Sequence, residues 1–324
     1  MAIKKAKKKG KSDVVIALSG GIGNQLFQFA YGLYLEKVYA FDVRYDCVLG
    51  MPRITGNSVT LFSLNLFDQE KVVSIGNSNA RRILRKCYGW TLTEALNGRN
   101  RPTLKSRMMT AITQVLLKSH FGRKSVHAAR DLGFDSRLPI VNNSIYIGYF
   151  QTFKFASDPI VFEFLMSLRP QSLGSKYYEI LEVIRKERPI LIHIRLTDYV
   201  SEKNFGIPSI SYYKEAVHSL LQGTPTSSVW VISDDLSGAR SYLDQLSSNP
   251  KLYFLDQSDF NDLEVWSLMR NFSGYVLSNS SFAWWAAFLR EDRGSKVFAP
   301  DPWFQGMRSP NCLLPRDWVR VRSL

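Results

Sequence analysis

The segment ERPILIHIRLTDYV ends an apolar run with a histidine, an arginine and an aspartate. His193 and Arg195 lie two positions apart, so in a strand both side chains project from the same face, and Asp198 follows three residues later. A guanidinium at the end of a strand can bind phosphate through two parallel hydrogen bonds, and it keeps its charge at physiological pH. The same pattern is compatible with a structural ion pair between Arg195 and Asp198.

Two further polar groups follow apolar runs. In GYVLSNSSFAWWAAFL, residues 278–281 precede a helical pattern as N-cap residues, and the amides of such a first turn attract an anion; Trp284 and Trp285 are expected in the core. In VISDDLS, Asp234 and Asp235 could together bind a divalent cation, since hard cations prefer oxygen ligands. Alternatively, one carboxylate accepts hydrogen bonds from a ribose or a base, and the other caps the following helix. Because no further convergent carboxylates are identified, no metal site is predicted.

A glycine-rich turn joins an apolar run to a helical pattern near the start, in VVIALSGGIGNQLFQFAYGLYL. Such a corner favours phosphate binding, and the dinucleotide fingerprint would begin at Gly21 and Gly23. An acidic residue, Asp46, follows at a suitable distance, but Leu26 stands where the fingerprint requires its third glycine. The segment is therefore not a dinucleotide-binding fingerprint.

The elements that would position these residues read most clearly in the second half. Short apolar runs alternate there with helical patterns, which indicates parallel strands covered on both faces. The expected strands span residues 190–195, 229–233, 251–256, 274–278 and 296–300. Ligands of such sheets bind beyond the carboxyl ends of the strands, where the polar groups above lie. The first half opens with a similar unit, with a helix from about residue 24 to 37 and further strands at 41–46 and 144–151.

Composition limits the class of protein. With 324 residues the chain suits two domains, and no apolar run approaches the 18 residues of a membrane span. The start lacks the apolar core of a signal peptide, and three scattered cysteines favour free thiols in a reducing compartment. The net charge of +14 includes six lysines in the first eleven residues, and a second basic stretch spans 81–107. These charges suit a solvated surface, nucleic acid or anionic lipid.

Taken together, the motifs resemble the alpha-1,2-fucosyltransferase family, glycosyltransferase family 11, in its bacterial type. The resemblance spans nearly the whole chain in the family's order. It is carried by GGIGNQLFQFAYGLYL, YIGYFQTFKF, HIRLTDYV, ISYYKEAV, VISDD, LSNSSFAWWAAFL and PDPWF. It implies an α/β protein of the GT-B type, with two Rossmann-like domains facing each other across a cleft. We expect a basic disordered arm at 1–12, an acceptor-side domain at 13–172 and a GDP-sugar-binding domain at 173–324.

The resemblance also implies roles for individual residues. Arg195 matches the arginine that faces the donor's diphosphate, and His193 and Asp198 are its companions and the candidates for a base. Donor contacts carried over from the family and its more distant relatives fall on Gly23, Asn24, His193, Arg195, Asp234, Ser280, Ser281 and Phe282. One position departs from the family motif, because Leu196 stands where a second arginine is usual. By strand alternation Leu196 faces away from Arg195.

The activity implied is inverting transfer of L-fucose from GDP-fucose to a hydroxyl of a glycan, such as O2 of a galactoside, in surface polysaccharide or O-antigen synthesis. A related GDP-deoxysugar such as GDP-colitose is the alternative donor. No metal or other cofactor is expected. The expected acceptor is an oligosaccharide or lipid-linked glycan, and the expected location is cytoplasmic, with peripheral contact to an anionic membrane through the basic arm. A nucleic-acid-binding protein is the competing class, disfavoured because the basic residues do not interleave with aromatic ones in a known module.

Overall fold

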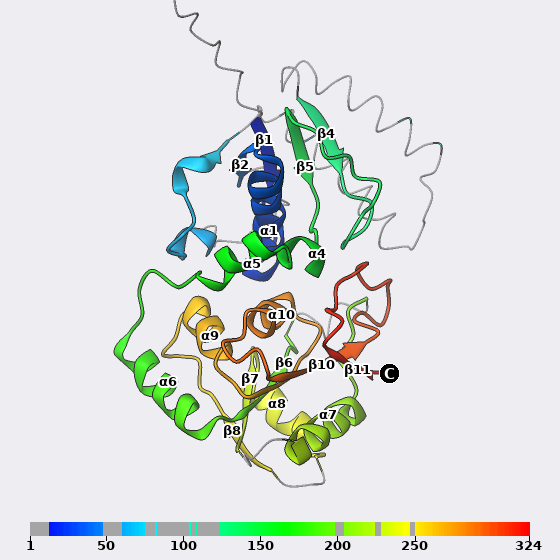
Figure 1. Cartoon of the computed structure of the whole chain (residues 1–324). Coiled ribbons are helices and arrows are strands. Elements are labelled where there is room, and N and C mark those ends of the chain that lie inside the picture. Colours follow the sequence, from blue (N-terminus) through cyan, green and yellow to red (C-terminus); the bar gives the residue numbers. More distant parts are fainter. Residues whose placement is uncertain are drawn as a thin grey trace, which may run out of the picture.

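The computed structural model describes residues 13–47, 60–74, 124–197, 204–223, 228–246 and 250–324, together with four single positions between 75 and 123. The predicted basic arm, almost all of the basic stretch 81–107, and Asp198 lie outside the described residues. The described chain forms two stacked halves, drawn in blue to green and in green to red in Figure 1.

The first half is built on a five-stranded parallel sheet with the order β3-β2-β1-β5-β4. Its strands are β1 (Asp13–Ala17), β2 (Asp42–Asp46), β3 (Val72–Val73), β4 (Ser125–Ala128) and β5 (Ser144–Ile147). The helices of this half are α1 (Ile22–Tyr39), the short 3₁₀ turns η1 (Thr60–Ser63) and η2 (Gln69–Lys71), α4 (Phe153–Ala156) and α5 (Pro159–Met166). Helix α1 packs against α4 and α5 (Figure 1).

The second half is a six-stranded parallel sheet with the order β11-β10-β9-β6-β7-β8. Its strands are β6 (Ile190–Ile194), β7 (Ser228–Ser233), β8 (Lys251–Phe254), β9 (Gly274–Val276), β10 (Lys296–Asp301) and β11 (Val319–Arg322). The helices are α6 (Ser175–Glu187), α7 (Ile210–Gly223), α8 (Leu236–Leu243), α9 (Asp262–Met269) and α10 (Ser281–Phe288). Counted from β6, the strand order is 3-2-1-4-5-6, the arrangement of the dinucleotide-binding Rossmann fold.

This architecture confirms the predicted fold class, two Rossmann-like α/β units facing each other in the GT-B arrangement (Figure 1). All five strands predicted for the second half are present. The apolar runs of β6 and β7 are buried on both faces of the sheet, whereas β8 is a partly exposed strand at its edge. Strand β11 was not predicted. Its sequence, VRVR, alternates apolar and basic residues, and at this edge of the sheet only Val321 is buried.

The two halves share a dry seam of aromatic residues beside the ends of α1 and α10. Phe27 of α1 lies 4.6 Å from Trp284 and 4.7 Å from Trp285 between ring centroids. Both tryptophans are fully buried, as the sequence predicted. The indole Nε1 of Trp285 donates to the carbonyl of Gly23 at 2.9 Å, which links α10 directly to the first turn of α1.

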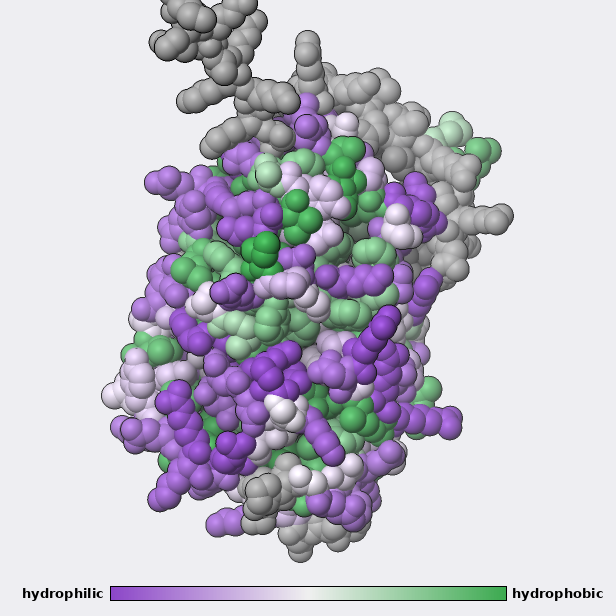
Figure 2. All heavy atoms as spheres, in the orientation of Figure 1, coloured by the Kyte–Doolittle hydropathy of each residue, from purple (hydrophilic) through white to green (hydrophobic). Residues whose placement is uncertain are grey.

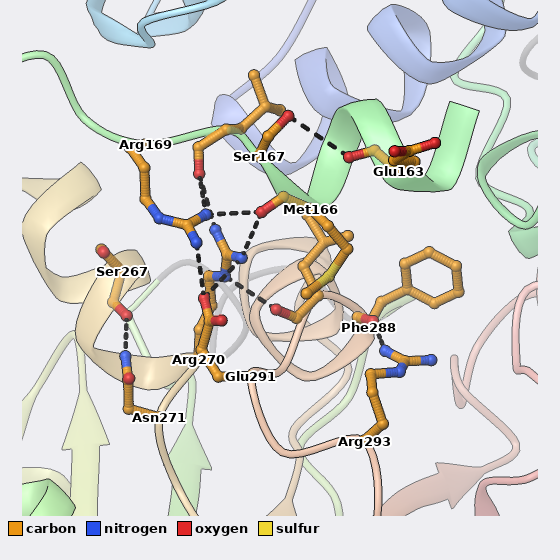
Figure 3. A network of polar contacts seen from close by, with 12 residues as sticks. Glu163, Met166, Ser167, Arg169, Ser267, Arg270, Asn271, Phe288, Glu291 and Arg293 are labelled. Atoms are coloured by element: carbon orange, nitrogen blue, oxygen red, sulfur yellow. Dashed lines mark hydrogen bonds and ion pairs between the residues drawn. The ribbon is translucent and has the colours of Figure 1, made fainter. Parts of the chain in front are cut away.

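A second contact between the halves is polar, and Figure 3 shows it at the end of α5. Arg270, at the end of α9, donates from Nη1 to the Leu168 carbonyl at 2.8 Å and from Nη2 to the Met166 carbonyl at 3.0 Å. Arg169 donates to the same two carbonyls, and Glu291 pairs with both guanidinium groups. Burial lowers the pKa of Arg270 to about 10, which leaves it charged at neutral pH.

A third contact between the halves lies near the carboxyl end of the chain. After β10, the segment around residue 311 lies against the first half, where the amide of Asn311 donates to Asp131 Oδ1 at 2.9 Å. Thr152 Oγ1 donates to the Cys312 carbonyl at 2.9 Å. The segments that follow β4 and β5 in the first half therefore hold the connection between β10 and β11 of the second half. The predicted boundary at 172/173 stays a prediction, although the strands of the two sheets fall on either side of it.

The surface in the view of Figure 2 is mostly hydrophilic, with hydrophobic residues in small patches among the polar ones. Within the part of the chain that the structure describes, no helix is long and apolar enough to span a bilayer.

Candidate functional site

A cavity of about 510 Å³ lies between the two halves, at the carboxyl ends of the central strands of both sheets. In the second sheet, β6 and β9 are the neighbours at which the strand order reverses, and the chain leaves them toward Arg195 and Ser280. In the first sheet, β1 and β5 occupy the corresponding place and lead to Gly21 and Tyr149. Ligands of open α/β sheets bind at this point, and here two such points face one cavity.

His193 and Arg195 reach the cavity from the end of β6, side by side as strand alternation predicted. Leu196, between Arg195 and the next turn, is buried in the apolar core of the second half, so the position of the missing second arginine faces away from the cavity. His193 Nδ1 lies 2.7 Å from Ser278 Oγ at the end of β9. Burial and the neighbouring Arg195 lower the pKa of His193 to about 3, so its imidazole is neutral at physiological pH.

Asp234 lines the cavity from the end of β7, but its carboxylate also organises the loop after β6. Oδ1 accepts the Leu196 amide at 2.8 Å, Oδ2 accepts the Thr197 hydroxyl, and Oδ2 lies 3.7 Å from Arg195 Nε. Asp235 caps α8 by accepting the Gly238 amide at 2.9 Å, one of the two roles that the sequence left open for this pair. Asp234 thus holds Arg195 in place at the cavity wall.

Two helices begin at the cavity, one from each half. The first turns of α1 and α10 contain no acidic residue, and neither N-cap residue, Gly21 or Ser280, makes a side-chain cap hydrogen bond. The positive ends of both helix dipoles therefore face the cavity without a carboxylate from their own first turns. Arg195 adds a formal positive charge on the same wall.

Gly23 allows these two helix starts to meet. A Cβ at this position would lie 2.5 Å from the Ser281 carbonyl carbon and 2.6 Å from the Phe282 nitrogen, distances that no side chain tolerates. At Gly21 the corresponding space is open. The glycine turn identified in the sequence is therefore a close contact between two helices as well as part of the cavity wall.

Most of the remaining wall was not predicted from the sequence. Asn279 is the exception, because it belongs to the polar group 278–281. Asn279 Nδ2 donates to the carbonyls of Phe205 and Gly206, both at 2.9 Å, and holds the loop before α7 against the cavity. Phe205 packs on Phe304, with 5.2 Å between the ring centroids. Phe304 is the last residue of the PDPWF segment quoted for the resemblance. Further lining residues are Tyr149, Gln151, Asn204, Gln257, Asp262, Trp303 and Met307. Several lie one to three residues past a strand, a place that sequence alone could have indicated.

The structure gathers all eight predicted donor contacts at this one cavity: Gly23, Asn24, His193, Arg195, Asp234, Ser280, Ser281 and Phe282. Asp198, predicted as a companion of Arg195, lies outside the described residues. Among the residues that the structure describes, no three histidine, cysteine or acidic side chains cluster as a metal site would need. A cationic wall with two helix starts and an apolar rim can bind a phosphorylated ligand that also carries a weakly polar group.

Two known proteins are similar to the chain over nearly its whole length. The chain is 25% identical to the alpha-1,2-colitosyltransferase of Escherichia coli over 337 residues, covering 96% of this chain and 100% of that protein. It is 23% identical to the O-antigen biosynthesis glycosyltransferase WbnK of Escherichia coli over 319 residues, covering 94% of this chain and 99% of that protein.

Among solved structures, fucosyltransferase NodZ from Bradyrhizobium is similar with a TM-score of 0.44 at 14% identity, over 86% of this chain and 92% of NodZ. POFUT1 in complex with GDP has a TM-score of 0.46 at 14% identity, over 89% of this chain and 98% of POFUT1. The model of glycosyl transferase family 11 matches residues 120–320, more than half of the chain, and includes strands β6 to β10 of the second sheet. The chain therefore belongs to glycosyl transferase family 11, the family that its motifs predicted.

Proposed function

We propose that the protein transfers a 6-deoxyhexose from its GDP-sugar to a glycan hydroxyl, with inversion at the anomeric carbon and formation of an α-1,2 linkage. The observation that carries this proposal is the convergence of Arg195 with the starts of α1 and α10 on one cavity. Three sources of positive potential suit the diphosphate of a nucleotide sugar. The name of one Escherichia coli relative, the O-antigen biosynthesis glycosyltransferase WbnK, supports O-antigen synthesis as the setting.

The donor we propose first is GDP-L-fucose, transferred to O2 of a galactoside. GDP-colitose is the second candidate, and the similarity to an alpha-1,2-colitosyltransferase favours it. The two sugars differ by one hydroxyl, at C3, and both carry a methyl group at C6. The apolar side chains of Phe282, Phe304 and Met307 at the cavity suit such a methyl group.

In the proposed reaction the acceptor oxygen attacks the anomeric carbon from the face opposite the leaving group. The electron pair of the breaking bond between the anomeric carbon and the phosphate oxygen passes to GDP, which leaves as an anion. Arg195 and the two helix starts stabilise the charge that develops there, without reorganisation at the moment of reaction. This is why we expect no metal to be required.

The acceptor proton must go to a base. With a pKa near 3, His193 is a weak base, and we propose that it acts as a neutral hydrogen-bonding group oriented by Ser278. Asp198 remains the carboxylate candidate from the sequence. The acceptor we propose is an oligosaccharide or lipid-linked glycan, reached from the cytoplasm, with the basic arm contacting anionic lipid.

The test is incubation of the purified protein with GDP-fucose or GDP-colitose and a β-galactoside, with the product linkage read by NMR. We expect an α-1,2-linked product, and its formation should continue in excess EDTA. The 2-deoxy galactoside is the matched control and should give no product. Transfer to another hydroxyl, or from neither donor, would contradict the proposal.

An Arg195→Ala variant tests whether Arg195 acts at the site. Loss of one preorganised donor costs about 100-fold or more in turnover. Arg195→Lys keeps the charge but not the planar two-point geometry, so it should also lose most of its turnover. A melting temperature that falls while turnover per folded molecule is preserved would assign Arg195 a purely structural role.

A further inference from the structure

Asn24 lines the cavity from the first turn of α1, and its amide has two chemically opposite ends. The Nδ2 end donates hydrogen bonds, and the Oδ1 end accepts them. Beside a phosphate the first end attracts and the second repels. The direction in which this amide is held therefore decides what Asn24 contributes to an anion site.

Gln151 determines that direction. Its Nε2 donates to Asn24 Oδ1 at 2.8 Å, across 127 positions of sequence. Gln151 is only 9% exposed, and its backbone N–H donates to the Leu132 carbonyl at 2.7 Å. With Oδ1 engaged by Gln151, Nδ2 is the end of Asn24 that remains for a ligand.

The backbone on both sides makes room for this pair. Phe150, directly before Gln151, has a φ of 52°, a conformation that is uncommon for a residue with a side chain. Its ring, which is buried, stacks on Tyr31 at 4.2 Å between centroids, so packing holds the strained residue in place. Gly20 has a φ of 76°, and a Cβ there would lie 2.6 Å from Asn24 Nδ2. A strained turn and a glycine thus accommodate one amide–amide contact.

We propose that Gln151 is a positioning residue, which orients the Asn24 amide so that Nδ2 donates to the diphosphate of the donor. This inference rests on the proposed function, because it takes the ligand at the start of α1 to be a nucleoside diphosphate. Gln151 itself does not need to touch the ligand. Its effect passes through Asn24.

The experiment is a double-mutant cycle of Gln151→Met and Asn24→Ala, with GDP affinity measured by calorimetry. Methionine keeps the length of the side chain but neither donates nor accepts strongly. We expect Gln151→Met to weaken GDP binding by about tenfold in the wild-type background, the size of one hydrogen bond to a charged group. In the Asn24→Ala background it should change the affinity by less than about twofold. The KM of the donor should rise in the single variant, while that of the acceptor stays unchanged.

Equal weakening of GDP binding in both backgrounds would overturn the inference, because Gln151 would then act independently of Asn24. Gln222→Met is the matched control: Gln222 lies at the end of α7 away from the cavity, so GDP affinity should stay at the wild-type value. If the wild-type protein does not bind GDP, the proposed function fails first.

Asn24→Asp tests the same geometry without altering Gln151. The carboxylate still accepts the hydrogen bond from Gln151 Nε2, but it presents an oxygen where Nδ2 stood. We expect GDP affinity to fall by more than about tenfold, more than in Asn24→Ala. An affinity equal to that of the wild type would show that Nδ2 does not face the phosphate, and it would overturn the inference even if the Gln151 variant failed to fold.

Discussion

Beside the cavity the halves meet through aromatic rings and one glycine, whereas beyond the end of α5 they meet through two arginines and backbone carbonyls. The seam of Phe27, Trp284 and Trp285 is dry, and its strength comes from close packing. The arginine contact instead supplies donors to carbonyls at and just after the end of α5, those of Met166 and Leu168. The aromatic seam sets the distance between the halves at the cavity. The arginines hold the segment after α5, which connects the two halves.

The largest effect that we expect comes from the polar contact. Arg270→Met removes the hydrogen bonds that Arg270 donates to the carbonyls of Met166, Leu168 and Leu289. Arg169 still donates to the first two carbonyls, but the Leu289 carbonyl loses a buried donor. Two lost hydrogen bonds and one buried carbonyl without this donor should lower the free energy of unfolding by about 3 kcal/mol in chemical denaturation. Arg169→Met is the control, because Arg169 donates to two of the same carbonyls but is half exposed; it should cost about 1 kcal/mol or less. Equal losses would mean that burial does not separate the two arginines.

A smaller effect on stability, but a direct one on the cavity, is expected from Gly23→Ala. The added methyl group would overlap backbone atoms of Ser281 and Phe282, and separating the helices should cost about 2 kcal/mol after the gain in helix propensity. GDP affinity should fall with it, as calorimetry would record. Gly21→Ala adds a methyl group into open space and should cost no more than about 1 kcal/mol for the weaker N-cap. A Gly23→Ala protein with wild-type stability would show that the helix starts separate without cost.

The smallest effect concerns one hydrogen bond in the dry seam. Trp285→Phe removes the bond from Nε1 to the Gly23 carbonyl but keeps an aromatic ring, so thermal unfolding should show a loss of about 1 kcal/mol. Trp284→Phe is the matched control, since Trp284 Nε1 donates to the Leu313 carbonyl at 3.1 Å. Both variants should lose similar stability, but only Trp285→Phe should raise the KM of the donor. A raised KM of the donor in both variants would mean that the hydrogen bond to Gly23 affects the cavity no more than the hydrogen bond to Leu313 does.

The sequence predicted the second half well because short, continuous apolar runs such as ILIHI, alternating with helical patterns, are typical of strands in a covered parallel sheet. It placed His193 and Arg195 on one face because strand alternation is local. It did not predict that Asp234 would hold the loop after β6, since that contact joins two strands 38 positions apart. Gln151 stood in a quoted motif, but its partner Asn24 lies 127 positions away. Gly23 was assigned to the ligand from the family likeness, and its packing against α10 became visible only when both halves were in place.

The contact of the first half with the segment near Asn311 has a mechanical consequence. The halves are joined covalently after α5, and the segment near Asn311 adds hydrogen bonds to Asp131 and from Thr152 at a separate place. A rotation about an axis through both places leaves these hydrogen bonds intact, whereas any other rotation of one half against the other has to break them. We therefore expect the cavity to open about that one axis, so that its walls separate and return in the same register.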